Sequence, residues 1–132
     1  MFLILLSFSA VTINAQFSAY LLELEANTKW DAVEENWSGI RDQWVANCKM
    51  DNTEKVNGLM LVQFESNLKW TAVEESWKKR RDAWIKDCAS VSSHAQLAKL
   101  LIELEENIKW TSVETSWKQR RTGWINELKK LK

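Results

Sequence analysis

The sequence predicts an all-α protein made of three tandem αα-hairpin repeats of 40 residues each. Two observations lead to this prediction. Nine tryptophans recur with a period of 40 residues, and the 132 residues include no proline and only three glycines. Because β-sandwiches and barrels need many turn residues, this composition favours helices.

The repeat is visible when the chain is aligned with itself without gaps. Each copy keeps a leucine, two glutamates, an asparagine, a valine and an arginine at equivalent positions, beside three tryptophans. We divide the chain into a leading segment, 1–15, and three repeats, 16–48, 49–88 and 89–132. The tryptophans of the repeats are Trp30, Trp37 and Trp44; Trp70, Trp77 and Trp84; and Trp110, Trp117 and Trp124.

The first half of each repeat predicts an amphipathic helix. In the third repeat, apolar residues at spacings of three and four form one stripe: Leu97, Leu100, Leu101, Leu104 and Ile108. An asparagine stands at the end of this half in every repeat, at Asn27, Asn67 and Asn107. Because asparagine tolerates the left-handed conformation, we expect it to close the first helix.

The second half of each repeat predicts another helix, which starts just after the first tryptophan. The segments 31–34, 71–74 and 111–114 begin with Asp or Thr and end with Glu, which is the capping-box pattern. On a helix that starts there, Val33, Trp37, Trp44 and Cys48 point within about 60° of one another. We therefore assign all nine tryptophans to the structural core, where each would bury about 150 to 250 Å².

The two cysteines occupy the same position in successive repeats. Cys48 and Cys88 are one repeat apart, and the third repeat has Leu128 at this position. The position therefore requires an apolar group, and we predict two buried thiols with no disulfide between them.

A single hairpin of this size cannot bury its own apolar stripe, so neighbouring repeats must cover one another. Two arrangements satisfy this requirement. The repeats can stack as a short solenoid, or they can close into a helical bundle.

The leading segment, 1–15, allows two interpretations. Its apolar run, followed by Ile13, Asn14 and Ala15, is typical of a secretory signal cleaved before Gln16, although no Lys or Arg stands near its start. The same residues also align with the link between repeats 2 and 3, which favours the end of a truncated repeat. Neither interpretation includes a membrane span, because about 20 apolar residues would be needed.

The residue patterns that catalytic, cofactor and metal sites require are not found in the sequence. His94 is the single histidine, and there is no glycine-rich phosphate loop, nucleophile motif or Cys/His spacing for zinc. We expect no enzyme activity, no catalytic residue, no cofactor and no metal.

The 18 basic and 18 acidic residues balance, but the charge rises from −4 in 9–48 to +1 in 49–88 and +3 in 89–132. The basic residues of repeats 2 and 3 form a candidate binding surface for phosphates or an acidic peptide: Lys78, Lys79, Arg80, Arg81, Lys118, Arg120 and Arg121. Neighbouring glutamates such as Glu74 and Glu114 favour the other interpretation, a solvated helix face whose charge is partly neutralised within the array.

One stretch of about 27 residues, 84–110, resembles a known family. It has, in order, a Trp, a Cys, a Ser-rich gap, a Gln-Leu pair and a Leu-x-x-Leu-Glu-x-x-Ile-x-Trp ending: Trp84, Cys88, 90–93, Gln96, Leu97, Leu101, Leu104, Glu105, Ile108 and Trp110. This order resembles the helical segment before the PHD finger in chromatin-remodeller accessory subunits of the bromodomain-adjacent-to-zinc-finger type. No zinc-finger cysteines follow and no bromodomain is present. The resemblance implies a nuclear helical module that scaffolds a remodeller or reader, and it assigns no ligand residue.

From these features we expect a non-enzymatic helical-repeat scaffold for protein–protein interaction, associated with chromatin and located in the nucleus. Two alternatives stay open. One is a secreted or periplasmic helical-repeat protein with a cleaved signal peptide. The other is a nucleic-acid-binding protein that uses the basic residues of repeats 2 and 3.

Overall fold

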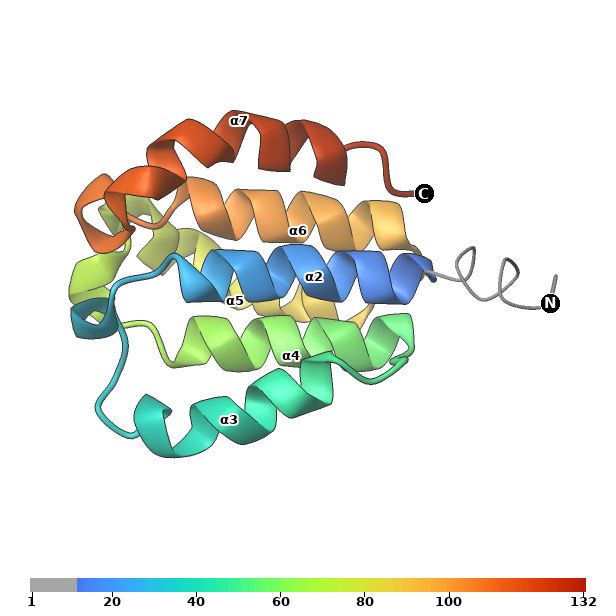
Figure 1. The fold of residues 1–132 in the computed structure, drawn as a ribbon, viewed down its shortest axis with the longest axis horizontal. Helices are drawn as coiled ribbons and strands as arrows, with labels where there is room; N and C mark the ends of the chain where they lie inside the picture. Colours follow the sequence, from blue (N-terminus) through green and yellow to red (C-terminus); the bar gives the residue numbers. More distant parts are fainter. Residues whose placement is uncertain (1–11) are drawn as a thin grey trace, which may run out of the picture.

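The computed structural model describes residues 12–132 and confirms the all-α prediction (Figure 1). Within this range each repeat contains two α-helices joined by a short 3₁₀ helix. The α-helices are α2 (Ile13–Ala26), α3 (Trp37–Cys48), α4 (Glu54–Ser66), α5 (Glu75–Ala89), α6 (His94–Glu106) and α7 (Thr115–Leu128). The 3₁₀ helices are η1 (Trp30–Ala32), η2 (Trp70–Ala72) and η3 (Trp110–Ser112).

The first helix of each repeat starts at a hydroxyl side chain. The hydroxyls of Thr12, Thr53 and Ser93 each accept from the amide three residues further along the chain. Such caps satisfy an amide that has no partner within the helix. Helix α2 therefore starts at Ile13, ahead of position 16, where we placed the start of repeat 1. The signal or truncated-repeat interpretations rest largely on residues 1–11, which lie outside the described part of the chain.

The first helices do not end in the left-handed conformation that we predicted. Asn27, Asn67 and Asn107 have φ of −98°, −100° and −102°. Each side-chain amide instead donates back to the carbonyl four residues earlier, at 2.8 to 2.9 Å. Each backbone carbonyl accepts from a neighbouring repeat, and this bond between repeats takes the place of a left-handed cap.

The predicted capping boxes are also wrong. Residues 31–34 and their equivalents form a 3₁₀ turn followed by extended backbone, and the second α-helix starts later, at Trp37, Glu75 or Thr115. The physical reason is a bond between repeats. The amides of Glu34, Glu74 and Glu114 donate to asparagine carbonyls of other repeats at 2.8 to 2.9 Å, and this bond requires extended backbone.

The three repeats close into a ring, so the structure is a closed bundle and not a solenoid. The inner helices α2, α4 and α6 all pack against one another, and α3, α5 and α7 surround them (Figure 1). Each outer helix also packs on the inner helix of the next repeat: α3 on α4, α5 on α6, and α7 on α2. The last contact joins repeat 3 to repeat 1 and completes the ring.

Three equivalent hydrogen bonds mark the joints between repeats. The indole Nε1 of Trp44 donates to the carbonyl of Met60, and that of Trp84 donates to the carbonyl of Leu100, both at 3.0 Å. The third bond runs from Trp124 back to the carbonyl of Tyr20, also at 3.0 Å. The closing joint therefore has the same geometry as the two joints between consecutive repeats.

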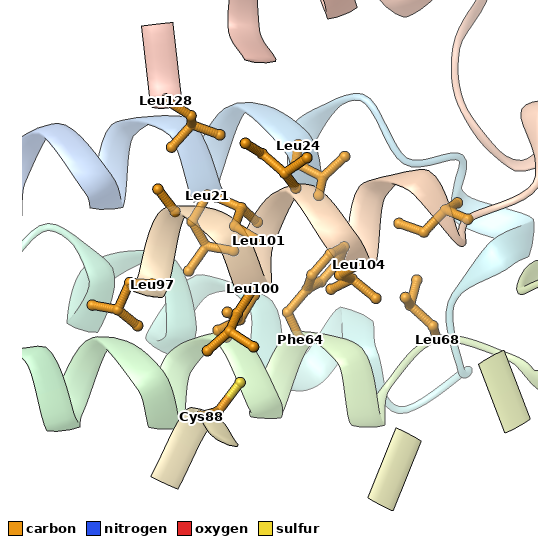
Figure 2. Packing of buried hydrophobic residues seen from close by; sticks show 14 of the residues in the cluster. Leu21, Leu24, Phe64, Leu68, Cys88, Leu97, Leu100, Leu101, Leu104 and Leu128 are labelled. Atoms are coloured by element: carbon orange, nitrogen blue, oxygen red, sulfur yellow. The ribbon is translucent and has the colours of Figure 1, made fainter. Parts of the chain in front are cut away.

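The core is continuous through the ring. Figure 2 shows leucines of α2 and α6 meeting in the centre, among them Leu21, Leu24, Leu101 and Leu104, with Phe64 of α4 beside them. The outer helices add pairs of buried tryptophans that meet edge to face, with ring centroids 5.1 to 5.3 Å apart. Such pairs stabilise a core beyond their area alone, by about 0.5 to 1.5 kcal/mol.

Gly58 allows α4 to lie close to α5, and this contact gives a stability prediction. A Cβ at this position would lie 2.5 Å from the carbonyl oxygen of Cys88. We expect Gly58→Ala to lower the free energy of unfolding by about 1 to 3 kcal/mol, because backbone must shift. Gly39→Ala is the control: nothing lies within 4 Å of its Cβ, so better helix propensity should stabilise the protein by about 0.5 to 1 kcal/mol. Equal effects in urea melts would contradict this account.

The two thiols are buried and reduced, as predicted. Burial raises the pKa of both Cys48 and Cys88 to about 12. Because the thiolate is the reactive form, we expect neither cysteine of the native protein to react with an aromatic disulfide reagent at about pH 8, and both to react in denaturant. Rapid labelling of either thiol without denaturant would show that the core opens there.

Candidate functional site

The nine tryptophans divide into two groups. The second and third tryptophans of every repeat are buried, as predicted: Trp37, Trp44, Trp77, Trp84, Trp117 and Trp124. Our assignment of the first tryptophans to the core is wrong, since Trp30, Trp70 and Trp110 are 61%, 49% and 47% exposed. Each stands at the start of a 3₁₀ turn, where it does not share the face of the following α-helix.

A buried glutamate connects the two helices of each repeat. In repeat 2, Glu65 is 3% exposed and its Oε2 accepts from the indole Nε1 of Trp77 at 3.0 Å. The Nε of Arg81 lies 2.9 and 2.8 Å from the two carboxylate oxygens. Equivalent trios occur in the other repeats: Glu25, Trp37 and Arg41, and Glu105, Trp117 and Arg121. The Glu and Arg that recur in the sequence are therefore structural partners of a buried indole.

The exposed indoles gather at one end of the bundle, which we call the tryptophan end and define by Trp30, Trp70 and Trp110. Backbone hydrogen bonds of 2.9 Å hold this end together, from the amides of Lys29, Lys69 and Lys109 to carbonyls of neighbouring repeats. These bonds run from repeat 1 to 3, from 2 to 1 and from 3 to 2. The tryptophan end is thus a hydrogen-bonded ring that presents three indoles at equivalent positions to solvent.

A cavity of about 230 to 240 Å³ lies beside each of these indoles. Every cavity is lined by the exposed tryptophan, by the buried glutamate and its arginine, and by a glutamate of a neighbouring repeat. The lining groups are Trp30, Glu25, Arg41 and Glu114; Trp70, Glu65, Arg81 and Glu34; and Trp110, Glu105, Arg121 and Glu74. An aromatic face beside carboxylates is suited to a cation or a hydrogen-bond donor.

The predicted basic surface consists largely of paired side chains. Arg80 binds Glu103 and Asp87, and Arg120 binds Glu23 and Glu127, at 2.6 to 3.0 Å. The pairs with Glu103 and Glu23 join an outer helix to the inner helix of the next repeat, whereas those with Asp87 and Glu127 lie within the outer helix. Their hydrogen bonds raise the pKa of both guanidinium groups. Because these arginines already form ion pairs within the protein, they are less available to bind a phosphate.

The lysines of the basic surface lie beside the exposed indoles. The Nζ of Lys78 is 5.6 Å from the ring centroid of Trp70 and donates to Glu75 at 2.9 Å. This hydrogen bond lowers the pKa of the Glu75 carboxyl. The Nζ of Lys118 is 5.5 Å from the ring centroid of Trp110. The structure thus brings part of the predicted surface to the tryptophan end, while Lys79 lies outside these contacts.

His94 belongs to the opposite end of the bundle. It is the first residue of α6, and its Nε2 lies within hydrogen-bond distance of the Asn14 side chain of α2. Its side chain is only 12% exposed, so it joins two repeats and is not solvated as a link residue would be. In residues 12–132, no three His, Cys, Asp or Glu side chains are grouped as a metal site would need. No helix within that range is long and apolar enough to cross a membrane.

Comparison with known proteins gives one match. Residues 58–111 match a family described as a domain of unknown function (DUF8799). The matched range covers less than half of the chain. The matched range includes all of α5 and α6, and hence the joint between repeats 2 and 3. Neither the curated proteins nor the solved structures contain a significant match.

Proposed function

We propose that the protein is a non-enzymatic scaffold that binds protein partners through the tryptophan end. The observation that carries this proposal is the exposure of Trp30, Trp70 and Trp110 on a ring held by backbone hydrogen bonds between the repeats. Aromatic residues are enriched in protein interfaces and among the residues that supply most of their binding energy. Because these three large indoles lie outside the buried core, their exposure supports a role in binding a partner.

The setting that we propose for this module is chromatin-associated and nuclear. It rests on the resemblance of 84–110 to the segment before the PHD finger of remodeller accessory subunits. A fluorescent fusion of the full natural gene product should then accumulate in the nucleus. Passage through the secretory pathway would contradict this part of the proposal and favour the secreted alternative.

Nucleic acid is a less well supported partner. Arg80, Arg81, Arg120 and Arg121 already pair with carboxylates, which leaves less free positive charge for phosphates. We expect duplex DNA to bind no more tightly than the non-specific range of about 10⁻⁴ to 10⁻⁶ M at physiological salt. A sub-micromolar complex that weakens steeply with salt would favour the nucleic-acid alternative.

The proposed function can be tested with peptides selected from a display library against the folded protein. We expect the selected peptides to shift the indole NMR signals of the tryptophan end and to lose binding when all three exposed tryptophans become alanine. Met50→Ala is the matched control, since Met50 is 62% exposed but follows α3 at the other end of the bundle. Peptides that bind the triple variant as tightly as the unchanged protein would contradict the proposal.

A further inference from the structure

The surroundings of Trp30 contain fewer cations than those of the other exposed indoles. Arg81 and Arg121 lie 5.8 Å from the ring centroids of Trp70 and Trp110, and each of these two rings is also covered by a lysine. In repeat 2, Lys78 covers the Trp70 ring and donates to Glu75. In repeat 3, Lys118 covers the Trp110 ring, with Thr115 in the place of Glu75. The equivalent residue of repeat 1 is Ser38, whose hydroxyl donates to the carbonyl of Glu35 at 3.2 Å within its own helix.

A cavity of about 230 Å³ lies where a lysine at position 38 would extend. Its lining contains Trp30, Val33, Glu34, Glu35, Ser38 and Lys69. The Trp30 indole is also the most exposed of the three, which agrees with the absence of a covering lysine at position 38. Repeat 1 therefore keeps the indole and the carboxylate that hold an ammonium group in repeat 2, and leaves space for one from outside.

The charges around this cavity favour a cation. Glu34 and Glu35 face a single lysine, Lys69, which leaves one negative charge in excess. In repeat 2 the equivalent pair, Glu74 and Glu75, is balanced because Lys78 accompanies Lys109. A cation over an indole face is attracted by the ring and, here, by the excess carboxylate as well.

The buried carboxylate of repeat 1, which lines the other cavity beside Trp30, also differs from its equivalents. In repeats 2 and 3 the arginine Nε lies within 2.9 Å of both carboxylate oxygens, whereas Arg41 reaches only the Oε2 of Glu25. The Oε1 of Glu25 is buried and has no hydrogen-bond donor in the described part of the chain. Glu25 is 4% exposed and lines the other cavity beside Trp30. Two groups near the Trp30 indole thus lack a hydrogen-bond donor that repeat 2 supplies: Glu35, which has no equivalent of Lys78, and the Oε1 of Glu25.

We propose that the cavity lined by Trp30, Glu35 and Ser38 binds the ammonium group of a lysine side chain from a partner protein. The ligand takes the place that Lys78 and Lys118 occupy in the other repeats, with its ammonium over the indole and a hydrogen bond to Glu35. Its aliphatic stem packs beside Val33. This inference rests on the proposed function, and it specifies one contact of the tryptophan end.

The test uses Nα-acetyl-lysine methylamide as the probe and the indole NMR signals of the full chain as the readout. We expect a weak, saturable shift of the Trp30 signal, with much smaller changes at Trp70 and Trp110, whose faces are already covered. The Nε-acetylated probe, which has no charge, should leave Trp30 unchanged. Glu35→Gln should weaken binding about threefold, as for other exposed ion pairs.

Two exchanges between repeats provide matched variants. Ser38→Lys should fill the cavity from within and reduce the Trp30 response at least about tenfold, since an attached side chain competes at high effective concentration. Lys78→Ser should remove the ammonium group beside Glu75 in repeat 2, so that Trp70 responds to the probe, although less than Trp30 does because Arg81 still lies 5.8 Å from the Trp70 ring. Both positions are on the surface of outer helices, and far-UV circular dichroism checks that the variants remain folded.

The inference would be overturned if the Trp30 NMR signal does not shift with the lysine probe, or if it shifts equally with the Nε-acetylated probe. An unresponsive Trp70 in folded Lys78→Ser would overturn it too. Failure of the scaffold proposal looks different. If selected peptides bind the tryptophan end without needing a lysine, only the proposal of a lysine site is refuted. If no selected peptide contacts this end, the scaffold proposal itself is refuted.

Discussion

Replacing Trp77 with alanine is expected to lower the free energy of unfolding by about 3 to 5 kcal/mol, the cost of a large cavity in a packed core. Trp77 has no exposed surface, and its ring meets Trp84 edge to face at 5.2 Å. Its indole also donates to the buried Glu65, which would lose one of its donors. Denaturant melts followed by far-UV circular dichroism measure the loss.

Trp70→Ala is the matched control for this prediction. The same indole is removed from the same repeat, but Trp70 is 49% exposed, so the loss should stay below about 1 kcal/mol. If Trp77→Ala does not fold, Trp77→Phe provides the measurement, because it keeps an aromatic ring and removes the donor. Similar losses for Trp70→Ala and Trp77→Ala would refute the division between buried and exposed tryptophans.

The second large effect is expected for Arg81→Ala, which leaves the Glu65 carboxylate buried beside one neutral donor. Removing one partner of a buried ion pair is costly because the other charge stays in a poorly solvated place, and we expect a loss of about 3 kcal/mol. Adding Glu65→Gln should recover part of this loss. The amide is uncharged, and its oxygen can still accept from Trp77.

Arg80→Ala is the control for the buried pair. Arg80 precedes Arg81 in the chain and makes more hydrogen bonds to carboxylates, but its side chain is 37% exposed and its partners are also solvated. Exposed ion pairs contribute at most about 1 kcal/mol, so its loss should be small. A larger loss for Arg80→Ala than for Arg81→Ala in urea melts would contradict the structural role of the Glu65 carboxylate.

The helices and their apolar stripes could be predicted from the sequence, because these features depend on residues three or four positions apart. The buried thiols could be predicted because the third repeat has Leu128 at the equivalent position. The start of the second helix could not be predicted in this way. Residues 31–34 match a capping box, yet the amide of Glu34 bonds to Asn67 of another repeat and holds the backbone extended. This extended segment also changes the phase of Trp30 relative to Trp37, which explains the error about its burial.

The sequence pattern does not distinguish a closed bundle from a solenoid, because the two share their contacts between consecutive repeats. One further signal in the sequence does point to the closed bundle. Arg80 and Arg120 are equivalent positions, as are Glu103 and Glu23, and the pair that joins α5 to α6 recurs between α7 and α2. The lysine site proposed at Trp30 could not be predicted from the charged residues of repeats 2 and 3, because the informative residue is Ser38, where repeat 1 lacks a lysine.

The central claim, a closed ring of three equivalent repeats, can be tested through the indole protons of Trp44, Trp84 and Trp124 in a nuclear Overhauser experiment. A closed ring predicts contacts from Trp44 to Met60, from Trp84 to Leu100 and from Trp124 to Tyr20, at similar intensity. The first two contacts serve as internal standards, since an open array would also contain them. Their presence without the contact between Trp124 and Tyr20 would contradict the ring.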